Sequence, residues 1–481
     1  MNRARITMLG SHEESLRYYL ETHPKGYERG AIVLFKRLRD SVADLEPSDR
    51  YIAVEVVPFQ EAWITGSSRA HVAFDLIHFR ELFRRCEEES LVFGFAHIHP
   101  GGPLQFSDVD EENEVTLATA LRNRNGPDAH FVALLLVKGA WIGRVRQGNA
   151  PQSVENARHV AVLNRQFEVF LDNPEASNDE LFLRQAAAFG APFVSKLKSL
   201  RVAVVGAGGT GSPTISLLAR AGVGEIVVID DDTLEKSNLN RVRGAGLADV
   251  GKKKAQISKS FVDGLRLGTR VAAINASVDQ SPEAVDALAS CDVIFGCTDD
   301  QIGRETLNAA LYFYAQVCID VGLGGQVVDD AEGLPFLKYH YGRISTIFPE
   351  RGECLFCQDV IRDVWIRHQY ALRQQPTLDE TEAQERYLER GGEQAPGVGP
   401  FTSAVADYGV ATLFDIIRPF RKFPPEVRED FFKIDFVRME IRSSQEKNDM
   451  NCPYCKGKLF LLAKEPYRLS RPALGKRDAA I

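Results

Sequence analysis

The stretch Arg201-Val202-Ala203-Val204-Val205-Gly206-Ala207-Gly208-Gly209-Thr210-Gly211 decides the fold expected for the second half of the chain. An apolar strand runs into a G-x-G-x-x-G turn, and an apolar-periodic helix follows to Ala221. Backbone amides at such a helix N-terminus bind phosphate. Asp230 ends the next expected strand, 225–229, at the distance where an acid binds ribose hydroxyls. These residues predict a nucleotide site in a Rossmann-like α/β domain, which a nicotinamide dehydrogenase would fit equally well.

The residues that follow favour ATP over a nicotinamide cofactor. Ser237-Asn238-Leu239-Asn240-Arg241 is followed by Lys254, and Cys297-Thr298-Asp299-Asp300 ends a third strand. Adenylation of a carboxylate needs cations around a triphosphate and a carboxylate that holds Mg²⁺. Arg241 and Lys254 supply the charge and Asp299 supplies the acid, whereas NAD carries no triphosphate to be split. The predicted cofactors are therefore ATP and Mg²⁺.

This ordered set resembles the activating-enzyme superfamily, which includes ubiquitin-activating-type enzymes and the ThiF-, MoeB- and HesA-like adenylyltransferases. The resemblance covers about residues 179–462 and includes Asp230-x-Asp232 and the S-N-L-x-R element. Arg184 matches an arginine that reaches the nucleotide of the neighbouring subunit in the family, so a homodimer through this domain is implied. The resemblance implies nucleotide contacts at Gly206, Gly208, Gly209, Gly211, Asp230, Asp232, Ser237, Asn238, Arg241, Lys254, Asp299, Asp300 and, from the neighbour, Arg184.

Two cysteine pairs predict a structural metal site. Cys354 and Cys357 form one C-x-x-C motif, and Cys452 and Cys455 form a second. Four thiolates in two such motifs make a closed zinc site, which here would join the end of the domain to the start of the crossover expected at 372–400. Cys-Pro-Tyr-Cys is also the dithiol motif of glutaredoxins. That motif should precede a helix, whereas here a short polar run follows it near the end of the chain.

The sequence departs from those activating enzymes that pass their substrate on as a thioester. They place a cysteine in the crossover, before the element matched here by Gly397-Val398-Gly399-Pro400, and this chain has none between Gln358 and Phe401. We therefore expect an acyl-adenylate that passes directly to an acceptor without an enzyme thioester. The hydroxyl of Thr402 or Ser403 is a less favoured acceptor. The four remaining cysteines are expected to be packed core thiols: Cys86, Cys291, Cys297 and Cys318.

The first half of the chain carries a second group of chemically active residues. The apolar stretch 91–96 predicts a strand that ends at His97-Ile98-His99-Pro100, so His97 and His99 point the same way. Asp110 follows a Gly/Pro loop and can fold back as a third ligand. Three protein ligands leave a fourth position for water, which is the arrangement of a hydrolytic zinc site. The alternative is that the histidines are ordinary strand-end residues, with Ser107 and Asp110 capping a helix expected at 109–123.

The pattern H-x-H-x7-S-x2-D with an upstream glutamate resembles the JAMM (JAB/MPN) family of zinc isopeptidases, over about residues 1–147. The matching glutamate is Glu28, which precedes a glycine and an apolar strand. The resemblance implies an α+β metallopeptidase domain in which Glu28 takes the proton of the attacking water and returns it to the leaving amine. Ser107 would stabilise the tetrahedral oxyanion. All five positions of the motif are filled, which disfavours the alternative of an inactive assembly scaffold.

Length and composition place the chain among soluble multidomain proteins. With 481 residues it is long enough for two or three domains, and its net charge of −8 argues against general nucleic-acid binding. No signal peptide is evident, and apolar runs such as 132–137 have the length of a strand, so we expect a cytoplasmic protein without a membrane contact. Thiols stay reduced there, so the eight cysteines are more typical of metal ligands or core residues than of disulfides.

Changes in the pattern of expected strands and helices along the chain predict its domain boundaries. The zinc domain is expected at 1–147 and the adenylation domain at 179–465. Between them, residues 148–178 are expected to be a connector with one helix near 153–171. The basic end at 466–481 is expected to be a flexible tail.

Both resemblances point to one substrate, a small ubiquitin-like protein with a C-terminal glycine. The zinc site would cut after that glycine, to trim a precursor or to reverse a conjugate, and the second domain would activate the exposed carboxylate with ATP. Fusions resembling this one belong to bacterial operons that encode a ubiquitin-like protein, often with a conjugating-type enzyme, and some serve antiviral defence. The alternative is sulfur-carrier metabolism, in which activation leads to a thiocarboxylate for cofactor or cysteine synthesis. The missing crossover cysteine favours that option.

Overall fold

The computed structural model describes residues 4–40, 42–69, 71–172, 179–374, 397–424, 427–443, 451–457, 461–462 and 469. Contacts between Cα atoms divide the chain into two compact units, made mainly of Met1–Val42 with Glu46–Ser177 and of Asn178–Leu461. No helix in the described part of the chain is long and apolar enough to cross a bilayer. The predictions of a crossover at 372–400 and a tail at 466–481 fall almost entirely outside the described residues.

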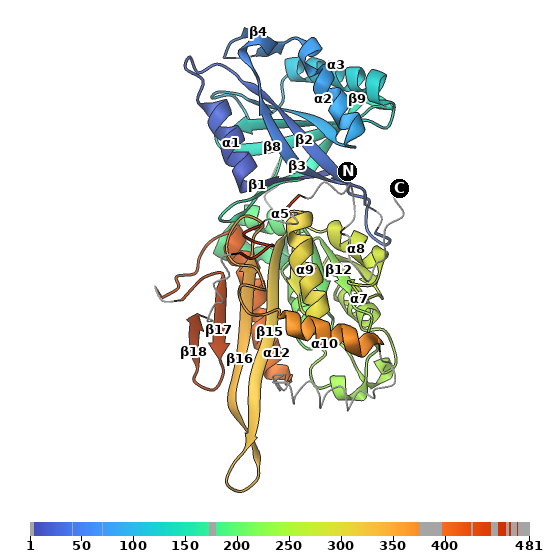
Figure 1. Ribbon diagram of the computed structural model, residues 1–481, viewed down its shortest axis with the longest axis vertical. Coiled ribbons are helices and arrows are strands. Elements are labelled where there is room, and N and C mark those ends of the chain that lie inside the picture. Colours follow the sequence, from blue (N-terminus) through green and yellow to red (C-terminus); the bar gives the residue numbers. More distant parts are fainter. Residues whose placement is uncertain are drawn as a thin grey trace. The chain divides into compact units, whose positions relative to one another are not determined.

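The first unit folds around one mixed β-sheet (Figure 1). In chain order its elements are β1 (Ala4–Leu9), α1 (Gly10–Glu21), β2 (Gly30–Leu38), β3 (Arg50–Pro58), β4 (Ile64–Ser67), β5 (Val72–Phe74), α2 (Arg80–Glu88), β6 (Val92–Ile98), α3 (Asp108–Asn125), β7 (His130–Val137), β8 (Ala140–Gln147), β9 (Ala150–Leu163) and β10 (Phe167–Phe170). The strand order of the sheet is β1-β3-β2-β6-β7-β8-β9-β10. Because β9 also pairs in parallel with β1, the sheet closes on itself.

The alternation of side chains along β6 decides which way the candidate zinc ligands face. Ala96 and Ile98 lie in the core cluster that includes Leu16 and Leu20 of α1. Phe93 and Phe95 lie in the other cluster, with residues of α2 and α3. Since successive strand residues alternate between the two faces of a sheet, His97 shares the face of Phe93 and Phe95, where α3 packs.

The helix predicted near 153–171 is wrong, because this segment forms β9 and β10. β9 pairs with β8 and β1, and its second half is buried, so sheet pairing overrides the local spacing of apolar residues. A local signal did favour the hairpin. Gly148 and Asn149 separate β8 from β9, and a Gly-Asn pair between two strand-like runs is typical of a two-residue hairpin turn.

The second unit is a Rossmann-like α/β fold, as predicted from the glycine turn. Its elements are α4 (Leu183–Phe189), α5 (Ala191–Ser199), β11 (Arg201–Val205), α6 (Gly211–Arg220), β12 (Glu225–Ile229), α7 (Lys254–Leu265), β13 (Arg270–Ile274), α8 (Pro282–Ala289), β14 (Val293–Gly296), α9 (Gln301–Phe313), β15 (Val317–Asp329), β16 (Pro335–Ile347), α10 (Asp363–Gln374), α12 (Gly399–Ile417), β17 (Phe431–Asp435) and β18 (Glu440–Ser443). The strand order is β13-β12-β11-β14-β15-β16-β17-β18.

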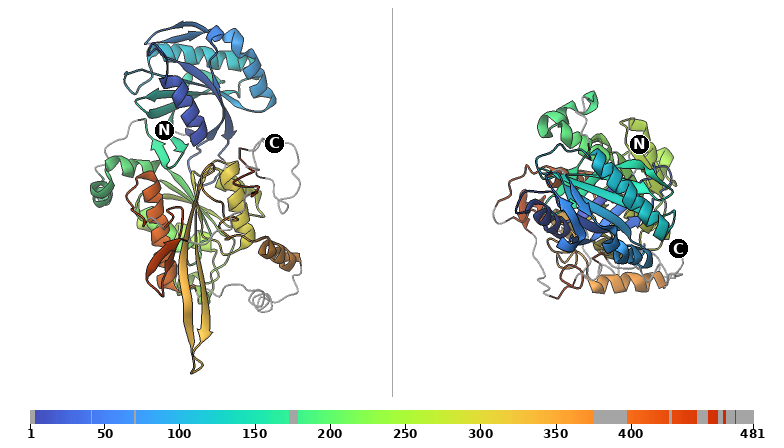
Figure 2. Two further views of the ribbon diagram at one scale, coloured as in Figure 1. Left: turned by 60° about the vertical axis from the view of Figure 1, so that its left-hand side comes forward. Right: turned by 90° about the horizontal axis from the view of Figure 1, so that it is seen from above.

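The topology of this sheet places a ligand site at the ends of β11 and β14. The strands from β13 to β15 pair in parallel, and the order reverses between β11 and β14. Open α/β sheets bind ligands at such a switch point, outside the carboxyl ends of the strands. α9 packs on β14 and β15, while α12 packs beside α6 and on β15 and β16; Figure 2 shows α9 and α12 on opposite sides of the sheet.

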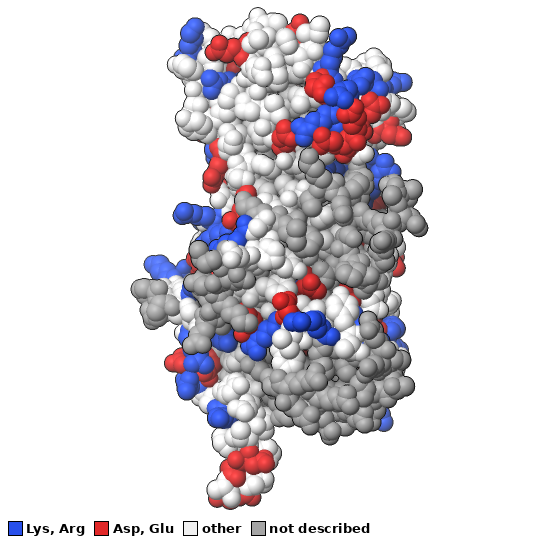
Figure 3. All heavy atoms as spheres, in the orientation of Figure 1, with Lys and Arg blue, Asp and Glu red and all other residues white. Residues whose placement is uncertain are grey.

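β15 and β16 continue beyond the sheet as a long antiparallel hairpin, which projects from the rest of the unit in Figure 1. Acidic side chains gather at its tip, where Asp329, Asp330 and Glu332 lie (Figure 3). In the first unit, charges of both signs gather over α2 and α3, where Arg84 pairs with Glu81 and Glu88. Neither surface is strongly basic.

Candidate metal and nucleotide sites

β6 and the first turn of α3 bring three possible metal ligands together in the first unit. His97 Nε2 lies 3.3 Å from His99 Nε2 and 2.9 Å from Asp110 Oδ1. His99 Nε2 lies 3.2 Å from Asp110 Oδ2, and the candidate ligand atoms all lie within 4.8 Å of one another. The sequence motif and the geometry therefore select the same three residues.

The spacing of these atoms fits a tetrahedral zinc ion. With bonds of about 2.0–2.1 Å, neighbouring ligands of tetrahedral Zn²⁺ lie about 3.3–3.4 Å apart. The distance between the two imidazole nitrogens is 3.3 Å, and the two contacts to Asp110 are slightly shorter, at 2.9 and 3.2 Å. Two histidines and a carboxylate are also a donor set that zinc accepts.

Asp110 both caps a helix and faces the histidines. The Ser107 hydroxyl accepts a hydrogen bond from Asp110 N, and Asp110 Oδ2 accepts one from Ser107 N at 2.7 Å. Burial alone would raise the pKa of Asp110, but hydrogen bonds from His97 and His99 outweigh it and hold that pKa well below its usual range. The carboxylate is therefore in the ionised form that binds a metal. Capping and metal binding are compatible at this residue.

Glu28 lies beside the triad, as the sequence motif predicts. Its side chain is 4% exposed, with Oε1 3.9 Å from His99 Nε2. Its backbone N–H donates to Ser68 O at 2.7 Å, and Ser67 Oγ donates to Glu28 O at 3.0 Å, so the end of β4 and the residue after it hold Glu28 in place. Burial raises the pKa of Glu28 to about 7.

Ser107 is engaged with its neighbour. Its hydroxyl donates to Asp110 Oδ2 at 2.7 Å. Ser107 therefore lies beside the triad, but in this arrangement its proton is directed toward Asp110. A role at an oxyanion would require the hydroxyl to turn.

The glycine loop of the second unit closes tightly at the switch point of the sheet. Gly206 has a φ of +94°, and a Cβ there would lie 2.6 Å from Cys297 O. A Cβ on Gly211 would collide with Gly206 O, whereas nothing lies within 4 Å of a Cβ placed on Gly208. The loop is therefore packed against the end of β14 on one side and open at Gly208, where a phosphate can approach the backbone.

Asp230 is fixed against this loop by backbone amides. Ala207 N donates to Asp230 Oδ2 at 2.6 Å, and Asp232 N donates to Oδ1 at 2.9 Å. Burial raises the pKa of Asp230 to about 6, against the lowering effect of the Ala207 amide. The sequence predicted an acid at this position for the ribose hydroxyls, and the structure places it next to the glycine turn.

The S-N-L-N-R element brings Arg241 to the loop. Arg241 Nη1 donates to Ser237 O at 3.0 Å, and Asn238 O accepts from Arg241 N at 3.0 Å, so Ser237 and Asn238 shape the turn that carries the arginine. A Cβ on Gly209 would lie 3.0 Å from Arg241 Cδ and 3.1 Å from Thr402 Cγ2. The beginning of α12 therefore also borders the loop.

The two hydroxyls considered as acceptors are already engaged. Thr402 Oγ1 donates to Gly399 O at 3.0 Å, which leaves its methyl group toward the loop. Ser403 Oγ accepts from Arg243 Nη2 at 3.2 Å. Neither arrangement favours an acyl transfer to these residues.

The other predicted nucleotide contacts are arranged less tightly. Lys254 begins α7, and its Nζ lies 2.7 Å from Asp232 Oδ2. Asp299 is exposed just after β14, while Asp300 caps α9 by accepting from Gly303 N. Arg184 lies exposed on α4 and, among the described residues, makes no contact with the glycine loop.

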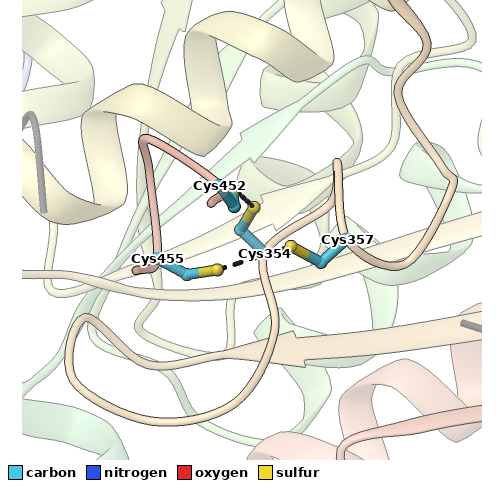
Figure 4. A group of neighbouring side chains, drawn as sticks. All are labelled: Cys354, Cys357, Cys452 and Cys455. Atoms are coloured by element: carbon cyan, nitrogen blue, oxygen red, sulfur yellow. Dashed lines mark hydrogen bonds between the residues drawn. The ribbon is translucent and has the colours of Figure 1, made fainter. Parts of the chain in front are cut away.

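The four predicted metal cysteines converge in the second unit (Figure 4). Cys354 Sγ lies 3.5 Å from Cys452 Sγ, and Cys357 Sγ lies 3.5 Å from Cys455 Sγ. In a tetrahedral zinc–thiolate site with bonds of about 2.3 Å, sulfur atoms lie about 3.8 Å apart. The cluster therefore has nearly the size of a closed zinc site. Each of the other four cysteines is buried, as expected of core thiols: Cys86, Cys291, Cys297 and Cys318.

The sequence analysis did not predict two residues that lie beside the three candidate metal ligands. Phe106 lies beside His97, and Arg144 stacks on Phe106 with its guanidinium carbon 4.0 Å from the ring centroid. Phe106 directly precedes Ser107, and this position within the motif could have indicated that it lies near the metal ligands. Arg144 lies 30 residues from its partner Glu114, and no local pattern could reveal that contact.

Comparison with known proteins finds similarity in the second unit. The ThiF family model matches residues 182–454. A "SAMP-activating enzyme E1" of Haloferax volcanii is 37% identical over 166 residues, 34% of this chain and 54% of that protein. The "Sulfur carrier protein ThiS adenylyltransferase" of Escherichia coli is 35% identical over 137 residues, 28% of this chain and 54% of that protein. The chain thus spans about half the length of these two relatives. A crystal structure of E. coli MccB matches with a TM-score of 0.44 at 19% identity, over 58% of this chain and 73% of that one.

Proposed function

Since the chain belongs to the ThiF family, we propose that it uses ATP to adenylate the C-terminal carboxylate of a small ubiquitin-like or sulfur-carrier protein. The observation that carries the proposal is the convergence of Asp230 and Arg241 on an open glycine loop at the switch point of a Rossmann-like sheet. A phosphate chain lying on this loop would have an acid on one side for the ribose and a cation on the other.

Each group in or near the glycine loop would have its own role in adenylation. Loop amides around Gly208 would bind phosphate oxygens, and Arg241 would stabilise the charge that develops as the carboxylate attacks the α-phosphate and pyrophosphate leaves. Lys254 would exchange its ion pair with Asp232 for the departing phosphates. Asp299 is the exposed carboxylate available to bind Mg²⁺, which would neutralise phosphate charge when bound.

Among possible substrates we favour a sulfur-carrier protein. One relative is named as a SAMP-activating enzyme, and another as the adenylyltransferase of the sulfur carrier protein ThiS. The absence of a cysteine between Gln358 and Phe401 removes the thioester step that a conjugating-type pathway would use. We therefore propose that the acyl-adenylate passes directly to a sulfur donor. Conjugation in a bacterial ubiquitin-like, antiviral pathway is the second candidate.

ATP–pyrophosphate exchange with purified candidate carrier proteins tests this proposal. A carrier ending in glycine should support exchange, while the same carrier lacking its last glycine should not. Isolating the products of the carrier protein at neutral pH distinguishes the two pathways. A thiocarboxylate formed with a sulfur donor supports the sulfur-carrier assignment, whereas a thiol-sensitive adduct between this chain and the carrier contradicts it. No exchange with any Gly-terminated carrier would refute adenylation.

As a second activity we propose zinc-dependent hydrolysis of a peptide or isopeptide bond after that same glycine. The supporting observation is the fit of His97, His99 and Asp110 to the edges of a zinc tetrahedron, with Glu28 beside them. Zn²⁺ bound there would supply Lewis acidity and lower the pKa of water to about 7. Glu28 would accept the water's proton and return it to the leaving amine. Ser107 would donate to the oxyanion after releasing its hydrogen bond to Asp110.

Zinc analysis and a cleavage assay on the full chain test the second activity. Wild type should bind two zinc ions, one in the triad and one in the cysteine cluster, and should cleave a carrier protein extended beyond its glycine. A chain that binds only the cysteine-held ion, and cleaves nothing, would support the scaffold alternative for the first unit. The sheet of the first unit continues through β9 and β10, so the predicted boundary at 147 is too early, and we extend the proposed metal domain to Phe170. Residues 179–465 remain our proposed adenylation domain. We also propose a homodimer through this domain, with Arg184 reaching the neighbouring nucleotide, and a cytoplasmic location.

A further inference from the structure

Among the described residues, none makes the hydrogen bond to His97 that usually orients a metal-binding histidine. In most metal sites the second ring nitrogen donates to a carboxylate, a carbonyl or water, and this contact fixes the plane of the ring. His97 is 1% exposed, and its Nδ1 has no hydrogen-bond partner among the described residues. The ring must therefore be oriented by packing if Nε2 is to face Asp110.

Two phenylalanine rings supply that packing. Phe95 lies two residues earlier on β6, with its ring centroid 5.3 Å from that of His97 and the planes at 9°. Phe106 lies just before α3, with its centroid 6.1 Å away and the planes at 53°. Phe95 belongs to the buried core of the sheet, whereas Phe106 is only half-buried on the Gly/Pro loop. Phe106 therefore needs a support of its own.

Arg144 of β8 provides the support for Phe106. Its guanidinium carbon lies 4.0 Å from the centroid of the Phe106 ring, which is the geometry of a cation–π contact. The side chain of Arg144 is 9% exposed, so the contact is largely shielded from water. Arg144 Nε donates to the Glu114 carboxylate, at 3.0 Å from Oε1 and 2.8 Å from Oε2.

Glu114 connects this contact to the helix that carries Asp110. It lies one turn after Asp110 on α3, is 1% exposed, and also accepts from Arg146 Nε at 3.0 Å. The half-buried Glu111 adds a contact to Arg144 Nη1 at 3.1 Å. Both α3 and the plane of the Phe106 ring are thereby fixed to β8 by the same buried charges.

We propose that Phe106 is a positioning residue, which Arg144 and Glu114 hold against His97 so that the imidazole stays oriented for metal binding. The inference rests on the proposed metal site, and goes beyond it by assigning the orientation of a ligand to ring packing. A planar guanidinium that stacks on a ring and binds a carboxylate cannot be replaced by lysine without losing that geometry. Phe106, Arg144 and Glu114 should therefore influence metal affinity without touching the metal.

Cobalt(II) titration of the full chain tests this proposal. The cysteine cluster is first loaded with zinc, and Co²⁺ is then added while its visible d–d bands are followed, because their position and intensity report coordination geometry. We expect Phe106→Leu and Arg144→Lys to weaken Co²⁺ binding about 10- to 100-fold and to alter the bands. Phe106→Tyr keeps the ring and should restore both readouts.

The exposed pair Arg124 and Glu87 offers a matched control at the other end of α3. Arg124→Lys should leave affinity and spectrum unchanged. If wild type binds Co²⁺ at the triad and both Phe106→Leu and Arg144→Lys keep its affinity and spectrum, the positioning role is refuted while the metal site stands. If wild type itself binds no Co²⁺ beyond the cysteine cluster, the metal site is refuted and this inference with it.

Discussion

The two candidate catalytic sites are built in opposite ways. In the first unit, His97, His99 and Asp110 are side chains on a strand and a helix, and their spacing already suits a metal. In the second unit, the site consists of backbone amides and charged side chains, and Lys254 forms an ion pair with Asp232. A metal triad requires fixed side chains, whereas a nucleotide brings enough charge to rearrange its own contacts. The two sites should therefore respond differently to substitution.

The largest expected effect is that of Glu28→Ala on cleavage. Loss of a general base lowers the rate by about 10²- to 10⁴-fold, while zinc content and pyrophosphate exchange should stay at wild-type levels. The measurement is the initial rate on a carrier protein with a C-terminal extension. Cleavage at the wild-type rate would show that another group accepts the proton and would refute the role proposed for Glu28.

Asp299→Ala should have the reciprocal effect. If Asp299 binds Mg²⁺ as proposed, ATP–pyrophosphate exchange should fall by about 10²- to 10³-fold in this variant, with cleavage unchanged. Asp263→Ala, at an exposed position on α7, is the matched control. Equal loss of both activities in Asp299→Ala would mean that the two sites are not independent.

Metal removal should separate the open site from the closed one. A chelator should take the ion from the three-ligand triad first and abolish cleavage, while the four-thiolate site keeps its ion. Cys354→Ser should then lower the free energy of unfolding of the second unit by about 3 kcal/mol through loss of bound zinc. Calorimetry and zinc analysis check this. A reversible disulfide under reducing conditions would instead support the dithiol alternative.

The smallest expected effect is a pH dependence confined to the nucleotide site. In the proposed site, the ionised form of Asp230 accepts hydrogen bonds from the ribose hydroxyls, and burial raises the pKa of Asp230 to about 6. The KM for ATP should therefore rise as pH falls through about 6, by up to tenfold per unit below it, because the protonated acid binds less well. Asp230→Asn should flatten this dependence. A KM that stays constant down to about pH 5 in wild type would contradict the assignment.

Local patterns predicted the parts of the fold that local chemistry determines. The strand at 201–205 with its glycine turn and the helix expected at 109–123 correspond to β11 and α3. The helix expected near 153–171 was wrong because β9 owes its conformation to pairing with β1, more than 140 residues earlier in the chain.

The same division holds for the sites. His97, His99 and Asp110 lie within 14 consecutive residues, so the motif alone selected them. The contact between Arg144 and Glu114 joins a strand to a helix and depends on how α3 packs, which no spacing in the sequence encodes. The cysteine cluster is an intermediate case. Its two C-x-x-C motifs are local patterns, but together they predicted a contact between residues 98 positions apart in the chain.

The pairing of β1 with β9 has a consequence for how the first unit folds. β1 is the first described strand of the chain, yet it is flanked by β3 on one side and by β9 on the other. During synthesis, the edge of β1 that pairs with β9 stays unpaired until residues near Leu163 have left the ribosome. The nascent chain therefore exposes a strand edge for a long time. Nascent chains stopped before β9 should be the species that chaperones bind, and a shortened first unit ending at Gln147 would lack the strand that completes its sheet.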